Sequence, residues 1–308
     1  MTKALSTSLT TCLEQLQHDN PANRMNAVQQ LVSQGADVIP ILKPLLHDAD
    51  ERLQRGAEGV LWRLALQHMT EKMSHALPSA SEKTRHRILA FLENINMQAA
   101  PQPVAPHILP ALITMLTADH SSIRVRAAIL LAGIGRAAAI PHLLPLIQDN
   151  NAFVRSVVIS ELTFLSAHEA MPQIIIALDD PDPQVRREAA FAPGWLQATD
   201  AIPALIDHLD DEDADVRRRI IQSLSVFEDN RAISALEYNL INGAIDARIA
   251  VFIAMKRCEN TRFIPALLDL LTIASWTQQL QILQKLRSLD SSITDPLLTE
   301  WYPDPPDV

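Results

Sequence analysis

One repeat unit is written in full in residues 199–229, which read TDAIPALIDHLDDEDADVRRRIIQSLSVFED. The same pattern returns along the chain at a constant spacing of 31 residues. Prolines keep this spacing at Pro110, Pro141, Pro172 and Pro203. Arginines keep it at Arg124, Arg155, Arg186, Arg217 and Arg248. Two residue types that hold one period over several units, without an insertion or deletion, indicate an internal structural repeat.

Each unit has the composition of two helices joined by tight turns. A proline costs little in the first turn of a helix, because its missing N–H has no intrahelical acceptor there. A side-chain oxygen just before a helix can accept one of the free N–H groups, so capping residues predict where helices begin. We expect the first helix to be capped at Thr199, Asn230 and Thr261, and the second at Asn151, Asp182 and Asp213.

Two helices of about 12 residues fill one unit, and neither buries its apolar face without a neighbouring repeat. The sequence therefore predicts an all-α fold, a right-handed α-solenoid of about nine helix pairs that is regular from Pro110 onward. Four segments are expected. They are divergent repeats in 1–98, a proline-rich break or hinge in 99–106, the regular array in 107–289 and a C-terminal tail in 290–308.

The unit Ile-Pro-x-Leu, Leu-x-Asp, Val-Arg-x-x-Ala resembles the HEAT repeat, in the short bacterial form named after phycobiliprotein lyases. The resemblance covers residues 106–289 and implies an armadillo-like helical fold. It also implies a ladder of aspartate and arginine side chains between successive repeats, built here from Asp149, Asp180, Asp211 and the arginines six residues after each. Asn242 stands ahead of Arg248, so that rung is expected to be weaker. A fold of this kind does not by itself select a function.

Composition excludes several classes of function. The 308 residues carry 26 Lys and Arg against 36 Asp and Glu, a net charge of −10, which argues against binding a nucleic-acid backbone. No run of about 18 apolar residues predicts a membrane-spanning helix. The N-terminus has no cationic stretch followed by an apolar core, so no secretory signal is predicted and a cytoplasmic location is expected.

The sequence also lacks the usual patterns of an enzyme. None of the ten histidines forms an HExxH motif, and His168-Glu169 is the one His-Glu pair. Cys12 and Cys258 lie far apart in the chain and predict neither a disulfide framework nor a zinc site. With no nucleophile–base pair, metal motif or phosphate loop, we expect no catalytic residue, no metal and no cofactor.

Helix geometry points to a candidate binding surface on the second helices. With the repeat arginine as position zero and about 100° per residue, positions −1, +3 and +7 face the core while +2, +5 and +9 face away. In HEAT-like solenoids the second helices line the concave surface. The outward positions carry unexpected aromatic residues, and exposed Trp, Phe and Arg often anchor interfaces. The predicted anchors are Phe164, Phe191 and Trp195, flanked by Arg126, Arg187 and Arg219.

The direction of Trp195 is left open by a proline in the same helix. Residues 191–195 read FAPGW, and Pro193 stands where other repeats carry leucine. A proline inside a helix removes one hydrogen bond and bends or ends the helix. Trp195 either joins the outward aromatic surface or is turned by the bend into the core between repeats.

A run of carboxylates forms a second candidate surface. Its members lie in the turns between first and second helices and are Asp207, Asp210, Asp211, Glu212, Asp213 and Asp215. Such an acidic edge attracts a basic partner and accelerates its encounter. The alternative is that these residues are helix caps and ladder residues with solubilising charge.

Three functions follow from these features. The first is a non-catalytic scaffold or adaptor that binds a protein or peptide on the concave surface. The second, implied by the resemblance to bilin lyases, is attachment or detachment of a tetrapyrrole on a protein cysteine. The third is an inhibitor or immunity protein whose acidic edge binds a basic partner.

Overall fold

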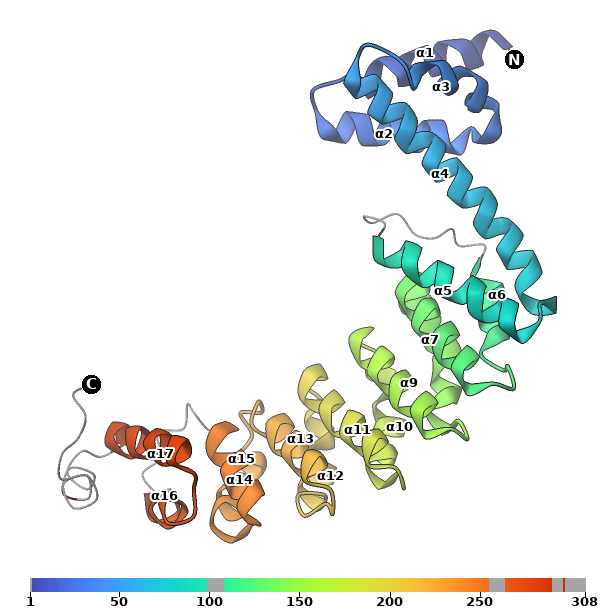
Figure 1. Cartoon of the computed structure of the whole chain (residues 1–308). Coiled ribbons are helices and arrows are strands. Elements are labelled where there is room, and N and C mark those ends of the chain that lie inside the picture. The colour runs from blue at the N-terminus through green and yellow to red at the C-terminus, as the bar shows by residue number, and fades with distance from the viewer. Residues whose placement is uncertain (1, 99–107, 255–263, 290–295, 297–308) are drawn as a thin grey trace. The chain divides into compact units, whose positions relative to one another are not determined.

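The computed structural model describes residues 2–98, 108–254, 264–289 and 296, with side chains from residue 9. Every regular element in these described residues is a helix (Figure 1). The chain forms two compact units, which are described separately. The first comprises residues 1–117 with 133–135, and the second comprises 118–132 and 136–308. The all-α repeat fold predicted from the sequence is confirmed.

Six α-helices lie wholly within the described residues of the first unit. They are α1 (Thr2–Leu16), α2 (Pro21–Ser33), α3 (Ile39–Leu45), α4 (Glu51–Ala76), α5 (Glu82–Gln98) and α6 (Leu109–Met115). Its core is a cluster of buried apolar side chains from α1 to α4 that includes Leu16, Leu31, Leu42 and Val60. Asp50 caps α4 through hydrogen bonds from the N–H groups of Arg52 and Leu53. This capped helix of 26 residues packs against both α1 and α2.

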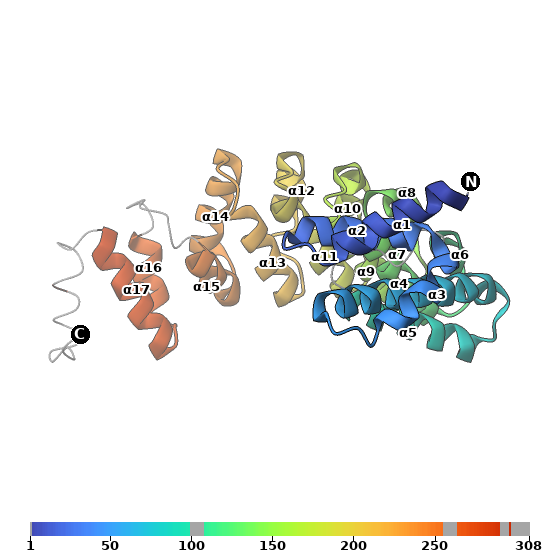
Figure 2. The same ribbon diagram turned by 90° about the horizontal axis from the view of Figure 1, so that it is seen from above.

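The second unit stacks helix pairs in two layers (Figure 2). One layer holds the second helices α7 (Ser121–Gly135), α9 (Ala152–Phe164), α11 (Pro183–Leu196), α13 (Ala214–Leu224) and α15 (Ile245–Ala254). The other holds α10 (Met171–Ile176), α12 (Ile202–Asp207) and α14 (Asn230–Asn242), with the short α8 (Ile140–Leu143) preceding them. A last pair is formed by α16 (Ile264–Leu271) and α17 (Trp276–Leu289). Consecutive second helices pack directly, as α9, α11 and α13 do.

The predicted core positions are confirmed throughout the regular repeats. In α9 the residues at −1, +3 and +7 are Val154, Val158 and Leu162, and all three are fully buried. The caps of the second helices are confirmed as well. The side-chain oxygens of Asn151, Asp182 and Asp213 accept hydrogen bonds from backbone N–H groups in the first turns of α9, α11 and α13.

The predicted caps of the first helices were wrong. Thr199 begins a 3-10 turn, residues 199–201, that leads into α12 without a side-chain cap. Asn230 is itself helical, and α14 is capped by Asp229, whose extended backbone lets its carboxylate accept the N–H of Arg231 at 2.8 Å. Thr261 lies outside the described residues. The helices α10 and α12 have six residues each, half the predicted length, because 3-10 turns lie on both sides of α10 and before α12.

One described segment, residues 121–148, is long and apolar enough by length and composition alone to cross a membrane. In the structure this segment is not one helix. Within it, α7 ends at Gly135, and the chain turns at Arg136, whose φ is +48°. The rest of the segment consists of α8 and 3-10 turns. The buried side chains of α7 and α8 include Ile123, Ala127 and Leu143, which pack within the repeats.

The predicted segment boundaries are only partly visible. The proline-rich break lies outside the described residues, and so does the tail apart from Pro296, so the hinge and tail remain predictions. The division between the two compact units falls at Thr117 and Ala118, after α6.

Candidate functional site

Three aromatic rings lie together on the outward side of the second helices. Phe164 ends α9, while Phe191 and Trp195 lie one turn apart on α11. The ring centroids of Phe164 and Trp195 are 5.7 Å apart in an edge-on arrangement, and those of Phe191 and Trp195 are 5.6 Å apart. Phe164 is 59% exposed and Trp195 54% exposed. We call these three residues the aromatic cluster.

A third repeat extends the cluster through an arginine. The guanidinium carbon of Arg219, on α13, lies 4.8 Å from the centroid of the Phe191 ring. This distance is within the range in which a cation is attracted to the face of an aromatic ring. Arg219 also donates a hydrogen bond to the side chain of Gln222 at 3.2 Å. The exposed surface therefore runs without interruption from α9 across α11 to α13.

The local packing of α11 explains why Trp195 faces outward. The helix continues past Pro193 to Leu196, so the proline does not end it. At the next residue, Gly194, an added Cβ would lie 2.5 Å from the hydroxyl oxygen of Ser223 on α13, so only glycine permits this approach. Pro193 and Gly194 are buried against the neighbouring repeat while Trp195 is not. The alternative that Trp195 is a core residue is wrong.

The other predicted outward positions agree with this arrangement. None of the twelve residues at +2, +5 and +9 in the four repeats is buried. Two more of them are large exposed aliphatic residues, Ile129 on α7 and Val226 just after α13. The second helices therefore present apolar side chains in all four repeats.

The two remaining predicted cations do not contact the aromatic rings. Arg187 donates to the carboxylate of Glu188 at 3.0 Å, and its Nε is buried without a hydrogen-bond partner. It lines a small pocket of about 250 Å³ with Asp213 and Asp215, near the N-terminal ends of α11 and α13. Arg126 lies partly buried on α7. Only Arg219 among the three predicted arginines joins the aromatic cluster.

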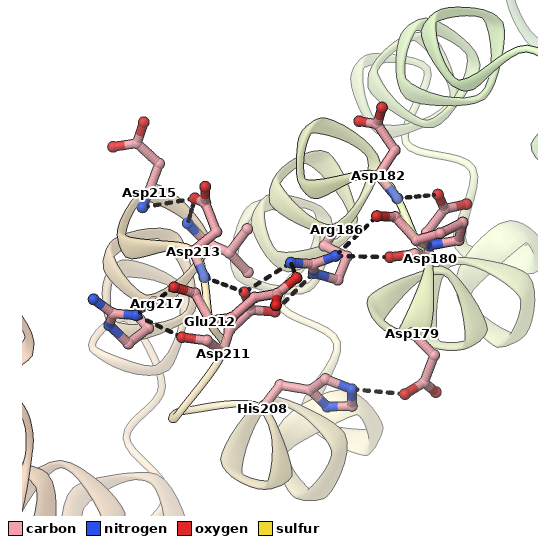
Figure 3. Close-up of polar contacts among 12 residues, drawn as sticks. Asp179, Asp180, Asp182, Arg186, His208, Asp211, Glu212, Asp213, Asp215 and Arg217 are labelled. Carbon is pink, nitrogen blue, oxygen red and sulfur yellow. Dashed lines mark hydrogen bonds and ion pairs between the residues drawn. The ribbon is translucent and has the colours of Figure 1, made fainter.

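The repeat arginines form the expected ladder, with a connectivity that the sequence did not specify. Figure 3 shows Arg186 donating to both carboxylate oxygens of Asp211, at 2.8 and 3.0 Å, and to the main-chain carbonyl of Asp180. Arg124, Arg155 and Arg186 each join the aspartate 25 residues later to the turn six residues earlier. The pairs Arg124–Asp149 and Arg155–Asp180 repeat this geometry at 2.7 Å.

The weak rung lies one repeat earlier than predicted. The residue 25 positions after Arg217 is Asn242, so it is Arg217 that lacks the usual carboxylate. Arg217 pairs instead with Asp246 at 2.6 Å, and that carboxylate is 44% exposed. Arg248 takes a different partner, Asp269, at 2.8 Å.

The ladder also sets the charge state of its aspartates. Burial of Asp149 and Asp180 favours their neutral forms. Hydrogen bonds from the arginine of the previous repeat and from a backbone N–H outweigh that effect and hold the pKa of each carboxyl below its usual value. These carboxylates stay ionised as parts of the framework.

The acidic edge is largely committed to contacts within the fold. Asp211 and Glu212 both bind Arg186, and Asp213 caps α13 (Figure 3). Asp215 pairs with Arg218 at 2.7 Å. Asp207 and Asp210 are exposed. The structure therefore supports the interpretation of this run as caps and ladder residues. Among the described residues, no three His, Cys, Asp or Glu side chains gather as metal ligands would.

Sequence reasoning missed one group of cations in the first unit. Arg52, Arg55 and Arg63 lie on one side of α4 with Gly56 and Gly59. Counted from Arg52, the other four residues follow after 3, 4, 7 and 11 positions, which is the spacing of one helix face and was present in the sequence.

The comparisons with known proteins agree with the repeat fold. A sequence model described as HEAT repeats matches residues 70–163 and 171–252, over half of the chain. Among proteins with curated functions, none matches the sequence significantly. The crystal structure of YibA from Escherichia coli is similar over 88% of this chain and 98% of its own, with 19% identity and a TM-score of 0.54. The CpcE–CpcF complex of phycocyanin lyase from Nostoc sp. PCC7120 matches 71% of this chain and 94% of that chain, with 20% identity and a TM-score of 0.45.

Proposed function

The chain belongs to the HEAT-repeat family, and we propose that it is a non-catalytic scaffold or adaptor that holds a partner protein or peptide against its second helices. The single observation that supports this function is the aromatic cluster. Two of its three rings are more than half exposed, although large aromatic side chains normally bury most of their surface.

The geometry of the cluster suits an anchor for a partner. Phenylalanine, tryptophan and arginine are enriched among the residues that carry most of the binding energy at interfaces. Here Trp195 packs edge to face against Phe164 and at a tilt of 41° against Phe191, so the three side chains support one another before a partner arrives. A preordered surface loses less conformational entropy on binding. The partner is expected to pack an apolar side chain against the exposed faces of Phe164 and Trp195.

The two other functions gain less support from the contacts. Four of the six acidic-edge residues already bind within the fold, which leaves Asp207 and Asp210 for a basic partner. A lyase-like activity is supported by the resemblance of the repeat sequence alone. The residues shared with that family are those that build the helical repeat.

The experiment is affinity capture from native lysate with the full chain and three single variants. Phe164→Asp and Trp195→Asp each place a charge in the aromatic cluster. The matched control is Phe153→Asp, because Phe153 lies on the same helix α9 and is 54% exposed, but is not part of the cluster. Captured proteins are quantified by mass spectrometry, and circular dichroism verifies that each variant is folded.

A partner bound by the wild type and by Phe153→Asp, but lost from both cluster variants, is the expected result. A partner retained by folded Phe164→Asp and Trp195→Asp would overturn the assignment of this surface.

A further inference from the structure

A pocket in the first unit gathers an unusual number of cations. Its volume is about 520 Å³, within the range of pockets that hold small molecules. Four arginines line it: Arg24 from α2, and Arg52, Arg55 and Arg63 from α4. This pocket lies within one compact unit and is independent of the aromatic cluster.

The arginines have few acidic partners. Arg52 pairs with Asp19, which also lines the pocket, and Arg55 pairs with Glu51 at 2.7 Å. Arg24 donates to the main-chain carbonyls of His18 and Asp19 at 2.7 and 2.8 Å, which are neutral acceptors.

Arg63 is the least satisfied of the four. Both of its terminal nitrogens point to the thioether sulfur of Met25, at 3.7 and 3.8 Å. Sulfur of this kind is a weak acceptor. In the described part of the chain, no carboxylate lies within ion-pair distance of Arg63.

The pocket therefore carries an excess of positive charge in a chain whose net charge is −10. Four guanidinium groups face the charges of Asp19 and Glu51, so two positive charges are not balanced by these partners. Like charges gathered in this way attract an anion, which would offset their mutual repulsion. Guanidinium groups match the planar, two-oxygen edges of phosphates and carboxylates.

The helix α4 keeps space open beside these charges. Gly59 lines the pocket, and a Cβ added there would meet no atom within 4 Å. Glycine inside a helix is less favourable than alanine, and packing does not require it at this position. Apolar side chains of Leu16, Met25 and Val28 complete the walls.

From this arrangement we propose that the pocket binds a small, multiply charged oxyanion, carrying phosphate or carboxylate groups on a partly apolar body. The charged groups lie against the arginines, and the body lies against Met25 and Val28. An anion with two or more negative charges matches the unbalanced charge of the pocket.

Isothermal titration calorimetry on the full chain at low ionic strength tests the proposal with three probes. Inorganic pyrophosphate supplies phosphate charge without an organic body, ADP adds a body to it, and citrate supplies carboxylates. At least one probe is expected to bind, and its affinity is expected to fall as salt is raised because the contacts are between charges. The probe that binds most tightly identifies the source of the anion.

Two variants test the place of binding in independent ways. Arg63→Glu reverses one charge, and we expect the affinity to fall about tenfold or more. Gly59→Leu fills the open space and leaves every arginine in place, and we expect binding to be lost while the thermal midpoint is not lowered. The control is Arg218→Glu on α13, an exposed arginine in the second unit, which is expected to bind as the wild type does.

The proposal is overturned if none of the three probes binds the wild type. It is equally overturned if a probe binds but neither Arg63→Glu nor Gly59→Leu weakens it, since the anion would then lie elsewhere.

Discussion

Glycine serves opposite purposes at two helical positions of this chain. At Gly194 the absence of a side chain lets α11 approach Ser223 on α13, and this close packing places Trp195 at the surface. At Gly59 no neighbouring atom fills the space that a side chain would occupy. The same residue type therefore has a packing reason in one helix and leaves a pocket open in the other.

Alanine is expected to change stability in opposite directions at these two positions. Gly194→Ala should lower the free energy of unfolding by about 1–3 kcal/mol, because the added methyl group overlaps Ser223. Gly59→Ala should raise it by about 0.5–1 kcal/mol, because alanine favours the helix and meets open space. Urea unfolding followed by circular dichroism measures both. Equal effects of the two substitutions would contradict the described packing of α11 against α13.

A second prediction at the residue scale concerns the ladder. Arg155 and Asp180 are 13% and 10% exposed, so Arg155→Ala leaves a buried carboxylate without its partner. We expect a loss of roughly 3 kcal/mol in the free energy of unfolding. Arg217→Ala should cost less, about 1–2 kcal/mol, because Asp246 can return to water. Urea midpoints of the two variants, compared with wild type, check this order, and a reversed order would refute it.

At the scale of elements, the second helices are joined by charge as well as by apolar packing. The carboxylate of Asp180 binds Arg155 of one repeat, while its main-chain carbonyl binds Arg186 of its own repeat. In this way the arginine of a second helix binds the turn that precedes its own helix. It also binds the turn that precedes the second helix of the following repeat. The short first helices α10 and α12 lie between these turns.

The ladder predicts how the second unit responds to acid. The pKa values of Asp149 and Asp180 are lower in the folded protein than their usual value near about 4. The stability that these carboxylates contribute is therefore fully present above pH of about 4 and is lost as the pH falls through the lower folded values. When urea unfolding is measured at decreasing pH from pH 7, the urea concentration at the midpoint should start to decrease once the pH is below about 4.

The control for this prediction is Asp180→Asn. This variant should be less stable than the wild type at pH 7, and its stability should depend less on pH below about 4. A pH profile identical to that of the wild type would show that Asp180 does not contribute to the acid response.

At the scale of the whole molecule, the negative net charge of the chain does not match the chemistry of its two proposed binding sites. The chain carries −10, yet the proposed binding surface is aromatic with Arg219 at its side, and the pocket of the first unit is cationic. Binding at an apolar surface depends weakly on ionic strength, whereas binding through an acidic edge depends on it strongly.

Salt therefore distinguishes the two proposed surfaces for a protein partner. If the partner binds the aromatic cluster, its dissociation constant should change by only a few-fold when ionic strength rises from low to physiological values. Surface plasmon resonance with the captured partner measures this dependence. A steep loss of affinity, together with binding that survives Trp195→Asp, would move the site to the exposed acids Asp207 and Asp210.

The repeat and its core were predictable from the sequence because each follows from local spacing, whereas the ladder was expected from the resemblance to HEAT repeats. A 31-residue period and a helical step of about 100° place Val154, Val158 and Leu162 in the core and Phe164 and Trp195 outside it. The caps of the second helices were predictable because each is a local hydrogen bond between one side chain and a backbone N–H two or three residues later. The first helices departed from prediction because 3-10 turns take up residues 177–179 and 199–201, and because Asp229, one residue before the predicted cap, caps α14.

By itself, the sequence determined the repeat class, the buried positions and the outward positions that carry Phe164, Phe191 and Trp195. Only the tertiary structure decided that Arg186 binds the aspartate of the following repeat, that Trp195 stays exposed beyond Pro193, and that four arginines converge on one pocket. The reason is that periodicity fixes the direction of a side chain on its own helix. The partner that it meets is set by the distance and angle between helices, which close contacts such as Gly194 against Ser223 determine.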